Sequence, residues 1–356
     1  MGIIRLLLAY CVVFGHTGGN LMIGPVLDPS IAVEAFYIIS GFYISLVLSN
    51  AYTNAYAFWI NRMLRLLPVY YAVLIAAFCI YTRENGHTVL TDLRALPLGA
   101  EIFLIFNQLT LIFQDLTLFV GIYHGHFSFL KSGAVSQPNL VGLLLIPQAW
   151  SLGVEISFYF VAPFIVRRLD LVVGCFIASL LLRAQLARWG YAGDPWGYRF
   201  FPSELALFLL GVMAHKIYRA WRDHFEAKRA LSLFLLLIVV GFIVFFAHLP
   251  VAATTKRLSF LSCLTVSLPY VFALTKNVTL DRLIANFSYP IYICHIAVMN
   301  FWGMHINAAN TPWSQAGLYL LILAVAAVLY WAVDHPMEKI RQRIKARDTQ
   351  LVTRPS

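Results

Sequence analysis

The amino-acid sequence predicts an all-α polytopic membrane protein with about ten transmembrane helices and one re-entrant or interfacial segment. Three observations support this fold class. The 356 residues are 60% hydrophobic and only 12% charged, whereas about 25% of the residues in soluble domains are charged. Apolar runs of about 17–25 residues, long enough to cross a bilayer, recur along the whole chain. These runs are apolar nearly all round, whereas helices of soluble proteins bury a single apolar stripe.

The expected spans are apolar segments joined mostly by short polar loops. The first of them carries one arginine and lacks a small-residue cleavage site, so we interpret it as a retained helix rather than a signal peptide. Residues 1–338 are expected to form one membrane domain, followed by a basic cytoplasmic tail, 339–356. The predicted spans are 3–18, 31–49, 60–81, 143–167, 171–187, 203–218, 231–248, 258–275, 287–305 and 316–333.

Segment 100–122 is ambiguous, because it is apolar but contains several polar side chains. Unpaired polar groups are costly in lipid. We therefore expect this segment to be interfacial, re-entrant or buried against protein, and not to cross the membrane as a simple helix. The polar residues are Glu101, Asn107, Gln108, Gln114 and Asp115.

The distribution of basic residues predicts the topology. If 100–122 does not cross, the main clusters of Lys and Arg and the basic tail all fall on one side, as the positive-inside rule requires. We therefore expect both termini in the cytoplasm. This placement accounts for the formal charge of +10, so nucleic acid is not expected as a partner. The five cysteines lie in apolar segments without metal-ligand spacing, and we expect neither a metal site nor a disulfide.

Three titratable residues are expected at one depth near the middle of the membrane. His16 follows Arg5 by eleven positions, about 16 Å along a helix, while Glu155 and His295 lie twelve and eight residues into their predicted spans. Imidazole suits proton transfer near neutral pH, and a carboxylate beside it can orient it. We therefore expect these three residues to share one cavity. A membrane histidine can also be a simple polar contact between helices, and the same pattern suits a proton-coupled transporter.

Two further groups of residues have both a functional and a structural interpretation. Arg62 and Arg65 share a helix face at the start of the third span, where they could bind donor phosphates. Spacing alone favours ordinary positive-inside anchoring. Small residues at Ser40-Gly41 favour helix packing. The outer cluster of Glu34, Arg199 and Glu204, with nearby aromatic side chains, could bind sugar hydroxyls or belong to an interfacial belt.

Five motifs, taken in order along the chain, resemble the membrane-bound acyltransferase-3 family, whose members acylate bacterial surface and secreted glycans. Each motif is weak alone, but together they occur with the family's order and spacing. Glu34 stands where many relatives have Asp, and Ala32 where many have Gly. The motifs are Arg5 with His16, Val33-Glu34-Ala35-Phe36-Tyr37-Ile38-Ile39-Ser40-Gly41-Phe42, Arg62-x-x-Arg65-x-x-Pro68, Trp150-Ser151-Leu152-x-Val154-Glu155, and Ser288-Tyr289-x-x-Tyr292-x-x-His295.

The resemblance implies a membrane O-acyltransferase of the bacterial inner membrane. Its donor would be acyl-CoA, most often acetyl-CoA, and its acceptor a hydroxyl of a lipid-linked, surface or secreted glycan. No hydrolase-like domain follows the last span, so we expect the membrane domain to act alone or with a separate protein. A proton-coupled transporter or flippase remains the alternative, and a non-catalytic scaffold a third reading. The sequence indicates no oligomeric state.

The resemblance also implies roles for individual residues. His16 would be a general base or a transient acyl carrier, with Glu155 orienting it or shuttling its proton. Arg62 and Arg65 would hold the donor phosphates. The donor site would also include Arg5 and Ser40, and the acceptor path or tunnel His295, Glu34, Trp150, Arg199 and Glu204.

Overall fold

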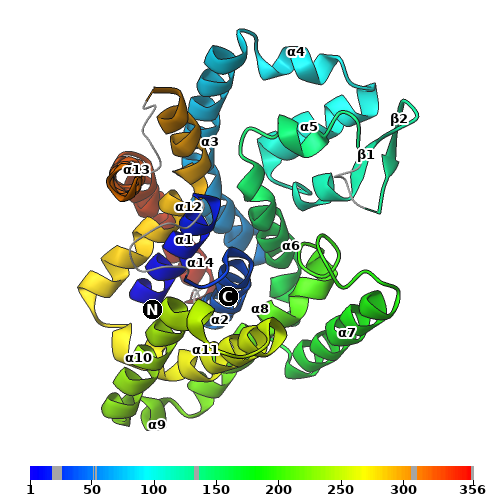
Figure 1. The fold of residues 1–356 in the computed structure, drawn as a ribbon. Helices are drawn as coiled ribbons and strands as arrows, with labels where there is room; N and C mark the ends of the chain where they lie inside the picture. The colour runs from blue at the N-terminus through cyan, green and yellow to red at the C-terminus, as the bar shows by residue number, and fades with distance from the viewer. Residues whose placement is uncertain (18–25, 51, 53, 132–135, 306–310, 354–356) are drawn as a thin grey trace.

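The computed structural model describes residues 1–17, 26–50, 52, 54–131, 136–305 and 311–353. Helices make up nearly all of its regular structure (Figure 1). The α-helices are α1 Gly2–His16, α2 Pro29–Asn50, α3 Ala55–Asn85, α4 Val89–Arg94, α5 Leu98–Thr110, α6 Trp150–Ile165, α7 Leu169–Arg188, α8 Phe201–Ala220, α9 Arg222–Ala227, α10 Arg229–Phe245, α11 Ala253–Thr275, α12 Thr279–His305, α13 Pro312–Leu329 and α14 His335–Thr353. Short helical turns are η1 Asp115–Leu118, η3 Leu140–Leu143, η4 Pro147–Ala149, η5 Phe246–His248 and the π-helical η6 Tyr330–Asp334, and the strands are β1 Val120–Tyr123 and β2 His126–Phe129.

Helices α1, α2, α8 and α12 form the centre of the molecule, with α2 packed on α8 and α12 on α1 (Figure 1). Helices α9–α11 lie at one edge, and α4, α5 and the two strands at the opposite edge. Glycines allow α2 and α8 to touch. A Cβ on Gly41 would lie 1.9 Å from the Phe208 carbonyl oxygen, and one on Gly211 would lie 1.8 Å from that of Ile38. Gly41 therefore serves helix packing, as the sequence predicted.

The membrane character of the fold agrees with the sequence, but the count of ten spans is not confirmed. Within the described residues, seven helices are long and apolar enough to cross a bilayer. Helices α1 and α6 have 15 and 16 residues, or about 22–24 Å, which is short of a ~30 Å hydrocarbon layer. Helix α8 is longer, but it carries several charged residues. The seven candidates are Pro29–Ser49, Ala55–Asn85, Leu169–Arg188, Arg229–His248, Ala253–Thr275, Thr279–Gly303 and Trp313–Ala346.

Two of the helix starts that differ from expectation change the positions of candidate site residues. Helix α6 starts at Trp150 and not at 143, because Pro147 lacks a backbone N–H and opens the separate turn η4. Glu155 is therefore the sixth residue of a helix and not the thirteenth of a longer span. Helix α12 starts at Thr279, which makes His295 its seventeenth residue. The depths inferred for Glu155 and His295 from sequence rested on wrong helix starts.

Segment 100–122 does not form one helix. Helix α5 ends at Thr110, Leu111 adopts a left-handed backbone with φ 62°, and η1 and β1 follow. Tyr70 and Tyr71, in the middle of α3, each donate a 2.6 Å hydrogen bond to a carbonyl oxygen in the last turn of α5. Helix α5 thus ends level with the middle of α3, as a re-entrant segment would.

Helix α5 has its polar side inside and its apolar side outside. Asn107 donates to Thr117 Oγ1 at 3.0 Å, and Gln108 Oε1 accepts from the Leu145 backbone N–H at 2.9 Å. Asp115 is also buried, and burial raises the pKa of its carboxyl to about 7. This inverted polarity suits a surface covered by lipid. The exposed apolar residues are Leu98, Ile102, Phe106, Leu109 and Phe113.

The structure agrees with the predicted all-α membrane fold and adds one small β-hairpin. Strands β1 and β2 pair antiparallel, with Tyr123 opposite His126. The two residues between them, His124 and Gly125, have φ values of 48° and 79°, as a tight two-residue hairpin turn requires. The His-Gly pair was the available signal for this turn.

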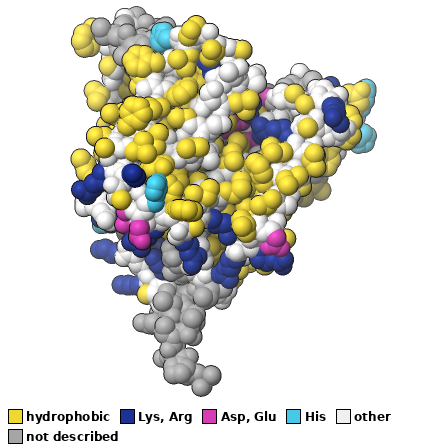
Figure 2. All heavy atoms as spheres, turned by 90° about the horizontal axis from the view of Figure 1, so that it is seen from below, with side chains coloured by type: hydrophobic (Ala, Val, Ile, Leu, Met, Phe, Trp, Pro, Cys, Tyr) yellow, Lys and Arg dark blue, Asp and Glu magenta, His cyan; other side chains and the backbone are white. Residues whose placement is uncertain are grey.

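Helix α14 crosses the predicted boundary between 338 and 339 without interruption and packs on α3. The Asn61 side chain donates to the Arg341 carbonyl oxygen at 2.9 Å. Figure 2 shows a broad apolar surface with basic side chains gathered toward one end of it. Helix connectivity places the basic ends of α8 and α11 and the basic starts of α10 and α12 at one end of the bundle.

Candidate functional site

Two of the cavities formed by the described residues contain predicted site residues. The arginine pocket has a volume of about 220 Å³ and is bounded by α1, α2, α3, α6 and α12. The histidine pocket is larger, about 780 Å³, and lies toward the C-terminal end of α1. Of the predicted site residues, Arg5, Ser40, Arg62, Arg65 and Glu155 line the arginine pocket, whereas His16, Trp150 and Arg199 line the histidine pocket.

The arginine pocket is basic. Three arginines and one carboxylate line it, which leaves an excess of two positive charges. Glu155 Oε1 accepts hydrogen bonds from Ser40 Oγ at 2.5 Å and from the Tyr159 hydroxyl at 2.7 Å. Among the described residues, the buried Nε atoms of Arg5 and Arg62 have no hydrogen-bond partner. Buried donors without acceptors favour an anionic ligand.

Arg65 is held by the C-terminal part of the chain. Its guanidinium donates to Asp334 Oδ2 at 2.5 Å, and Arg341 donates to the other carboxylate oxygen at 3.2 Å. Asp334 is almost fully buried, so this carboxylate orients two guanidiniums at once. The sequence analysis did not single out Asp334 or Arg341, since both lie far along the chain from Arg65.

His16 lines the histidine pocket, and its ring contacts that of His295, which is fully buried and lines neither pocket. The ring centroids of His16 and His295 are 5.0 Å apart. His16 Nδ1 lies 2.8 Å from the Val12 carbonyl oxygen, and His295 Nδ1 lies 2.7 Å from that of Tyr292. A carbonyl oxygen can only accept, so in each neutral ring Nδ1 carries the hydrogen and Nε2 is the basic atom. In each histidine, the basic nitrogen Nε2 is therefore the ring nitrogen that is not bonded to a backbone carbonyl oxygen.

The prediction that Glu155 shares a cavity with His16 is wrong. Glu155 lines the arginine pocket, and His16 lines the histidine pocket. Backbone carbonyls rather than Glu155 fix the imidazole tautomers. The physical reason is that α6 starts later than expected, while His16 is the last residue of α1. The expected approach of His16 and His295 is confirmed.

Of the predicted acceptor residues, some line the histidine pocket, whereas Glu34 and Glu204 are buried outside it. Glu34 is 1% exposed and pairs with Arg257, whose Nε donates to it at 2.7 Å. Glu204 is fully buried and pairs with Arg183 at 2.5 Å. Neither carboxylate lines either pocket, but Arg257 lines the histidine pocket. The structure therefore places Arg257, and not Glu34, in the lining of the histidine pocket.

Trp150 and Arg199 form one face of the histidine pocket. The Arg199 guanidinium lies 4.2 Å from the centroid of the Trp150 ring system, an attractive cation–π geometry. Asp194 accepts from Arg199 at 2.7 and 3.0 Å. Asp28 and Tyr198 also line this pocket. The combination of aromatic faces with paired charges can bind a polyhydroxylated ligand.

Arg257 and Asp28 were missed by sequence reasoning. Arg257 stands next to an apolar run and looks like an interfacial anchor. The usable signal was Glu34, because a carboxylate inside a span requires a cationic partner. Asp28 precedes a helix start and resembles an ordinary capping residue. Within the described residues, no three His, Cys, Asp or Glu side chains cluster as metal ligands would.

Comparison with known proteins supplies the family. A family model described as an acyltransferase domain, of the acyltransferase-3 type, matches residues 1–331. The chain belongs to the acyltransferase-3 family. The match includes every helix that lines the two pockets.

Two curated relatives are similar to this acyltransferase-family chain. An uncharacterized protein of Aquifex aeolicus is 29% identical over 205 residues, which are 56% of this chain and 90% of that protein. YrhL of Bacillus subtilis, a putative peptidoglycan O-acetyltransferase, is 28% identical over 166 residues. That match covers 44% of this chain and about a fifth (21%) of YrhL. No solved structure matches the chain.

Proposed function

We propose that this acyltransferase moves an acyl group, with acetyl as the expected one, from acyl-CoA in the arginine pocket to a glycan hydroxyl in the histidine pocket. The observation that carries the proposal is the pairing of a small basic pocket with a larger pocket rich in aromatic and charged groups. The putative O-acetyltransferase activity of YrhL supports the choice of an O-acetyl transfer.

The size of the arginine pocket suggests which part of the donor it holds. Pockets for drug-sized ligands are usually about 300–1,000 Å³, whereas this cavity has about 220 Å³. We therefore place the acyl-thioester arm inside it and the phosphates at its basic entrance. Arg62 and Arg65 would bind the phosphates, and Arg5 would extend the positive field inward. Glu155 would hold Ser40 and Tyr159 in place as part of this donor site.

Proton transfer would fall to His16. Its Nε2 would take the proton of the acceptor hydroxyl as the oxygen attacks the thioester carbonyl carbon. The carbon–sulfur bond then breaks, and the imidazolium returns the proton to the CoA thiolate. The products are an O-acyl ester and free CoA thiol. His295, beside His16, would help position the acceptor hydroxyl.

We place the arginine pocket on the cytoplasmic side of an inner membrane, where acyl-CoA is available. The concentration of basic side chains at one end of the molecule supports this orientation. The acceptor would then reach the histidine pocket from the opposite face. Holding both substrates at adjacent pockets provides the entropic advantage of a preassembled reaction.

Two measurements test the proposed function. Calorimetry of the purified protein in nanodiscs should detect acetyl-CoA binding. Mass spectrometry of surface and secreted glycans should show acetyl groups that are lost on deletion of the gene and on complementation with His16→Ala, but restored by the wild-type gene. Absence of acetyl-CoA binding would favour a transporter over an acyltransferase. Binding with unchanged glycans in the deletion strain would refute the glycan acceptor.

A further inference from the structure

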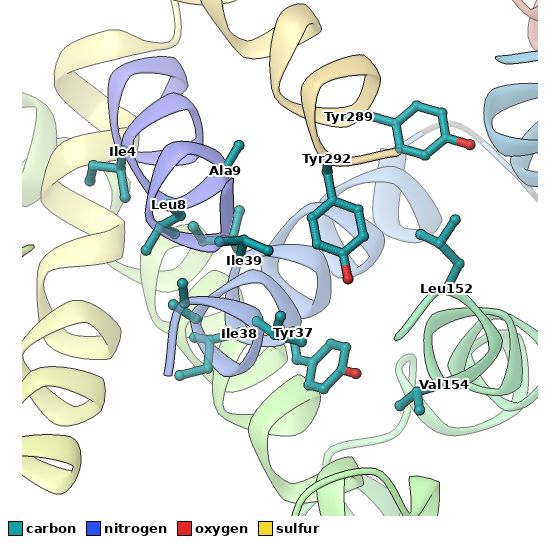
Figure 3. Packing of buried hydrophobic residues seen from close by; sticks show 14 of the residues in the cluster. Ile4, Leu8, Ala9, Tyr37, Ile38, Ile39, Leu152, Val154, Tyr289 and Tyr292 are labelled. Atoms are coloured by element: carbon teal, nitrogen blue, oxygen red, sulfur yellow. The ribbon is translucent and has the colours of Figure 1, made fainter. Parts of the chain in front are cut away.

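The arginine and histidine pockets have two lining residues in common, Val33 from α2 and Tyr292 from α12. All other lining residues of each pocket belong to that pocket alone. Figure 3 shows the Tyr292 ring extending from α12 toward the space between α2 and the start of α6, near Leu152. These two side chains therefore form the wall between the two pockets.

Hydrogen bonds hold the Tyr292 ring in place. Its hydroxyl lies 2.6 Å from Ser151 Oγ and donates to the Gln148 carbonyl oxygen at 3.0 Å. The ring packs edge-on against Phe36, with centroids 6.4 Å apart. Tyr292 is only 8% exposed. The aromatic part of the wall is thus held in place by hydrogen bonds to its hydroxyl group.

Gln148, which accepts the hydrogen bond from the Tyr292 hydroxyl, can itself be contacted by a molecule in the histidine pocket. Gln148 lines the histidine pocket, and its side-chain Oε1 is buried without a hydrogen-bond partner among the described residues. The Tyr292 carbonyl also accepts the hydrogen bond from His295 Nδ1. A molecule that binds to the Gln148 side chain therefore contacts the residue whose backbone carbonyl oxygen holds the Tyr292 hydroxyl.

We propose that Tyr292, with Val33, is a gate that seals the donor thioester from the histidine pocket until an acceptor is bound. The inference rests on the proposed function. The transfer needs the acceptor oxygen to reach the thioester carbon, and this wall lies between the two pockets. The same wall keeps the water of the larger pocket from that carbon. Tyr292 is thus a positioning residue that suppresses hydrolysis of acyl-CoA to free carboxylate, CoA thiol and a proton.

The test compares hydrolysis with binding in the absence of acceptor. Purified protein in nanodiscs is incubated with acetyl-CoA, free CoA is quantified by chromatography, and acetyl-CoA affinity is measured by calorimetry. At saturating acetyl-CoA, Tyr292→Ala and Val33→Ala should raise the rate of hydrolysis about tenfold, equivalent to about 1.4 kcal/mol of activation free energy. Tyr292→Phe keeps the ring but loses its fastening, and should give a smaller rise.

Tyr70→Phe is the matched control, because it also removes a buried 2.6 Å phenol hydrogen bond but lines neither pocket. Its hydrolysis rate should equal that of the wild type. Wild-type hydrolysis in both Val33→Ala and Tyr292→Ala, with acetyl-CoA still bound, would overturn the gate and leave the proposed function standing. Lack of acetyl-CoA binding by the wild type would instead refute the proposed function itself. An equal rise in Tyr70→Phe would also overturn the gate, because general loosening would then explain the leak.

Discussion

His16 and His295 come from opposite ends of the chain, yet their rings lie 5.0 Å apart with an interplanar angle of 54°. Each ring is anchored through Nδ1 to a backbone carbonyl. With Nδ1 of both rings engaged in this way, Nε2 is the ring atom that can exchange a proton. A pair of this kind can take a proton from a hydroxyl and release it to a leaving thiolate.

Substitution of His16 tests this proton transfer. His16→Ala should lower acyl transfer about 10²–10⁴-fold, the usual effect of losing a general base, while acetyl-CoA affinity stays unchanged. His248→Ala is the control, since His248 is exposed and lines neither pocket. The readout is acetyl content of the glycan product together with calorimetry. Activity within a few-fold of wild type would remove His16 from the mechanism.

The donor arginines make a second prediction. Arg62→Ala and Arg65→Ala should weaken acetyl-CoA binding, and Asp334→Asn should weaken it too, because Asp334 orients Arg65. Arg62→Lys should not restore the affinity if the contact to phosphate is bidentate. Calorimetry measures each affinity, with the exposed Arg168→Ala as control. Equal affinities in the wild type and all four test variants would contradict the placement of the donor.

Asp115 predicts a pH dependence of stability. Burial raises the pKa of its carboxyl from 3.8 to about 7, so between these values the folded state binds more protons than the unfolded state. Stability should therefore fall as pH rises toward 7 and then level off. Asp115→Asn should flatten this decline. Thermal unfolding in detergent at pH 5, 6, 7 and 8 measures it, and parallel curves for both proteins would contradict the assignment.

The glycine contact between α2 and α8 predicts a loss of stability. Gly41→Ala places a Cβ 1.9 Å from the Phe208 carbonyl oxygen, so the helices must separate, and overpacking of this kind typically costs about 1–3 kcal/mol. Gly174→Ala is the matched control, because it is also helical but has open space around its added Cβ. Thermal unfolding of both variants decides the matter. A Gly41→Ala protein as stable as the Gly174→Ala protein would show that this close packing is not required.

The re-entrant placement of α5 is tested by accessibility. Cysteines placed at Ala95 and Lys131, in a background without native cysteines, should react with an impermeant thiol reagent from the same side of the membrane. Arg168→Cys, at the end of the bundle with the basic loops, should react from the other side. Labelling of Ala95 and Lys131 from opposite sides would mean that 100–122 crosses the membrane, and would move the C-terminus outside.

Features that depend on composition and local motifs could be predicted from the sequence. Features that depend on contacts between residues far apart in the chain could not. Hydropathy identified the membrane class, and five motifs identified the family. The helix start at Trp150 was missed because apolar character continues through the preceding turns, although Pro147 could have marked the break. The pairing of Glu34 with Arg257 was missed because the partner lies more than 200 positions away (|i−j| of 223).

The separate placement of His16 and Glu155 could not be predicted from depth alone. Depth along a helix gives the position of a residue across the membrane, but it does not show which cavity of the bundle the residue faces. Residues at similar depth can line different pockets, as His16 and Glu155 do. The approach of His16 and His295 was predicted correctly because α1 and α12 pack directly on each other.

The inverted polarity of α5 has a consequence for the order in which the chain is assembled during synthesis. The partners of the Asn107 and Gln108 side chains, Thr117 and Leu145, are translated after α5 itself. A nascent chain that ends shortly after α5 would have a thirteen-residue helix with several polar groups unpaired, and such a helix has little tendency to remain in lipid. Helix α5 should therefore enter the bilayer only after α6 has been inserted, by folding back onto α3 from the membrane surface. Biogenesis of this protein would then include a late, post-insertional step that the order of its helices along the chain does not reveal.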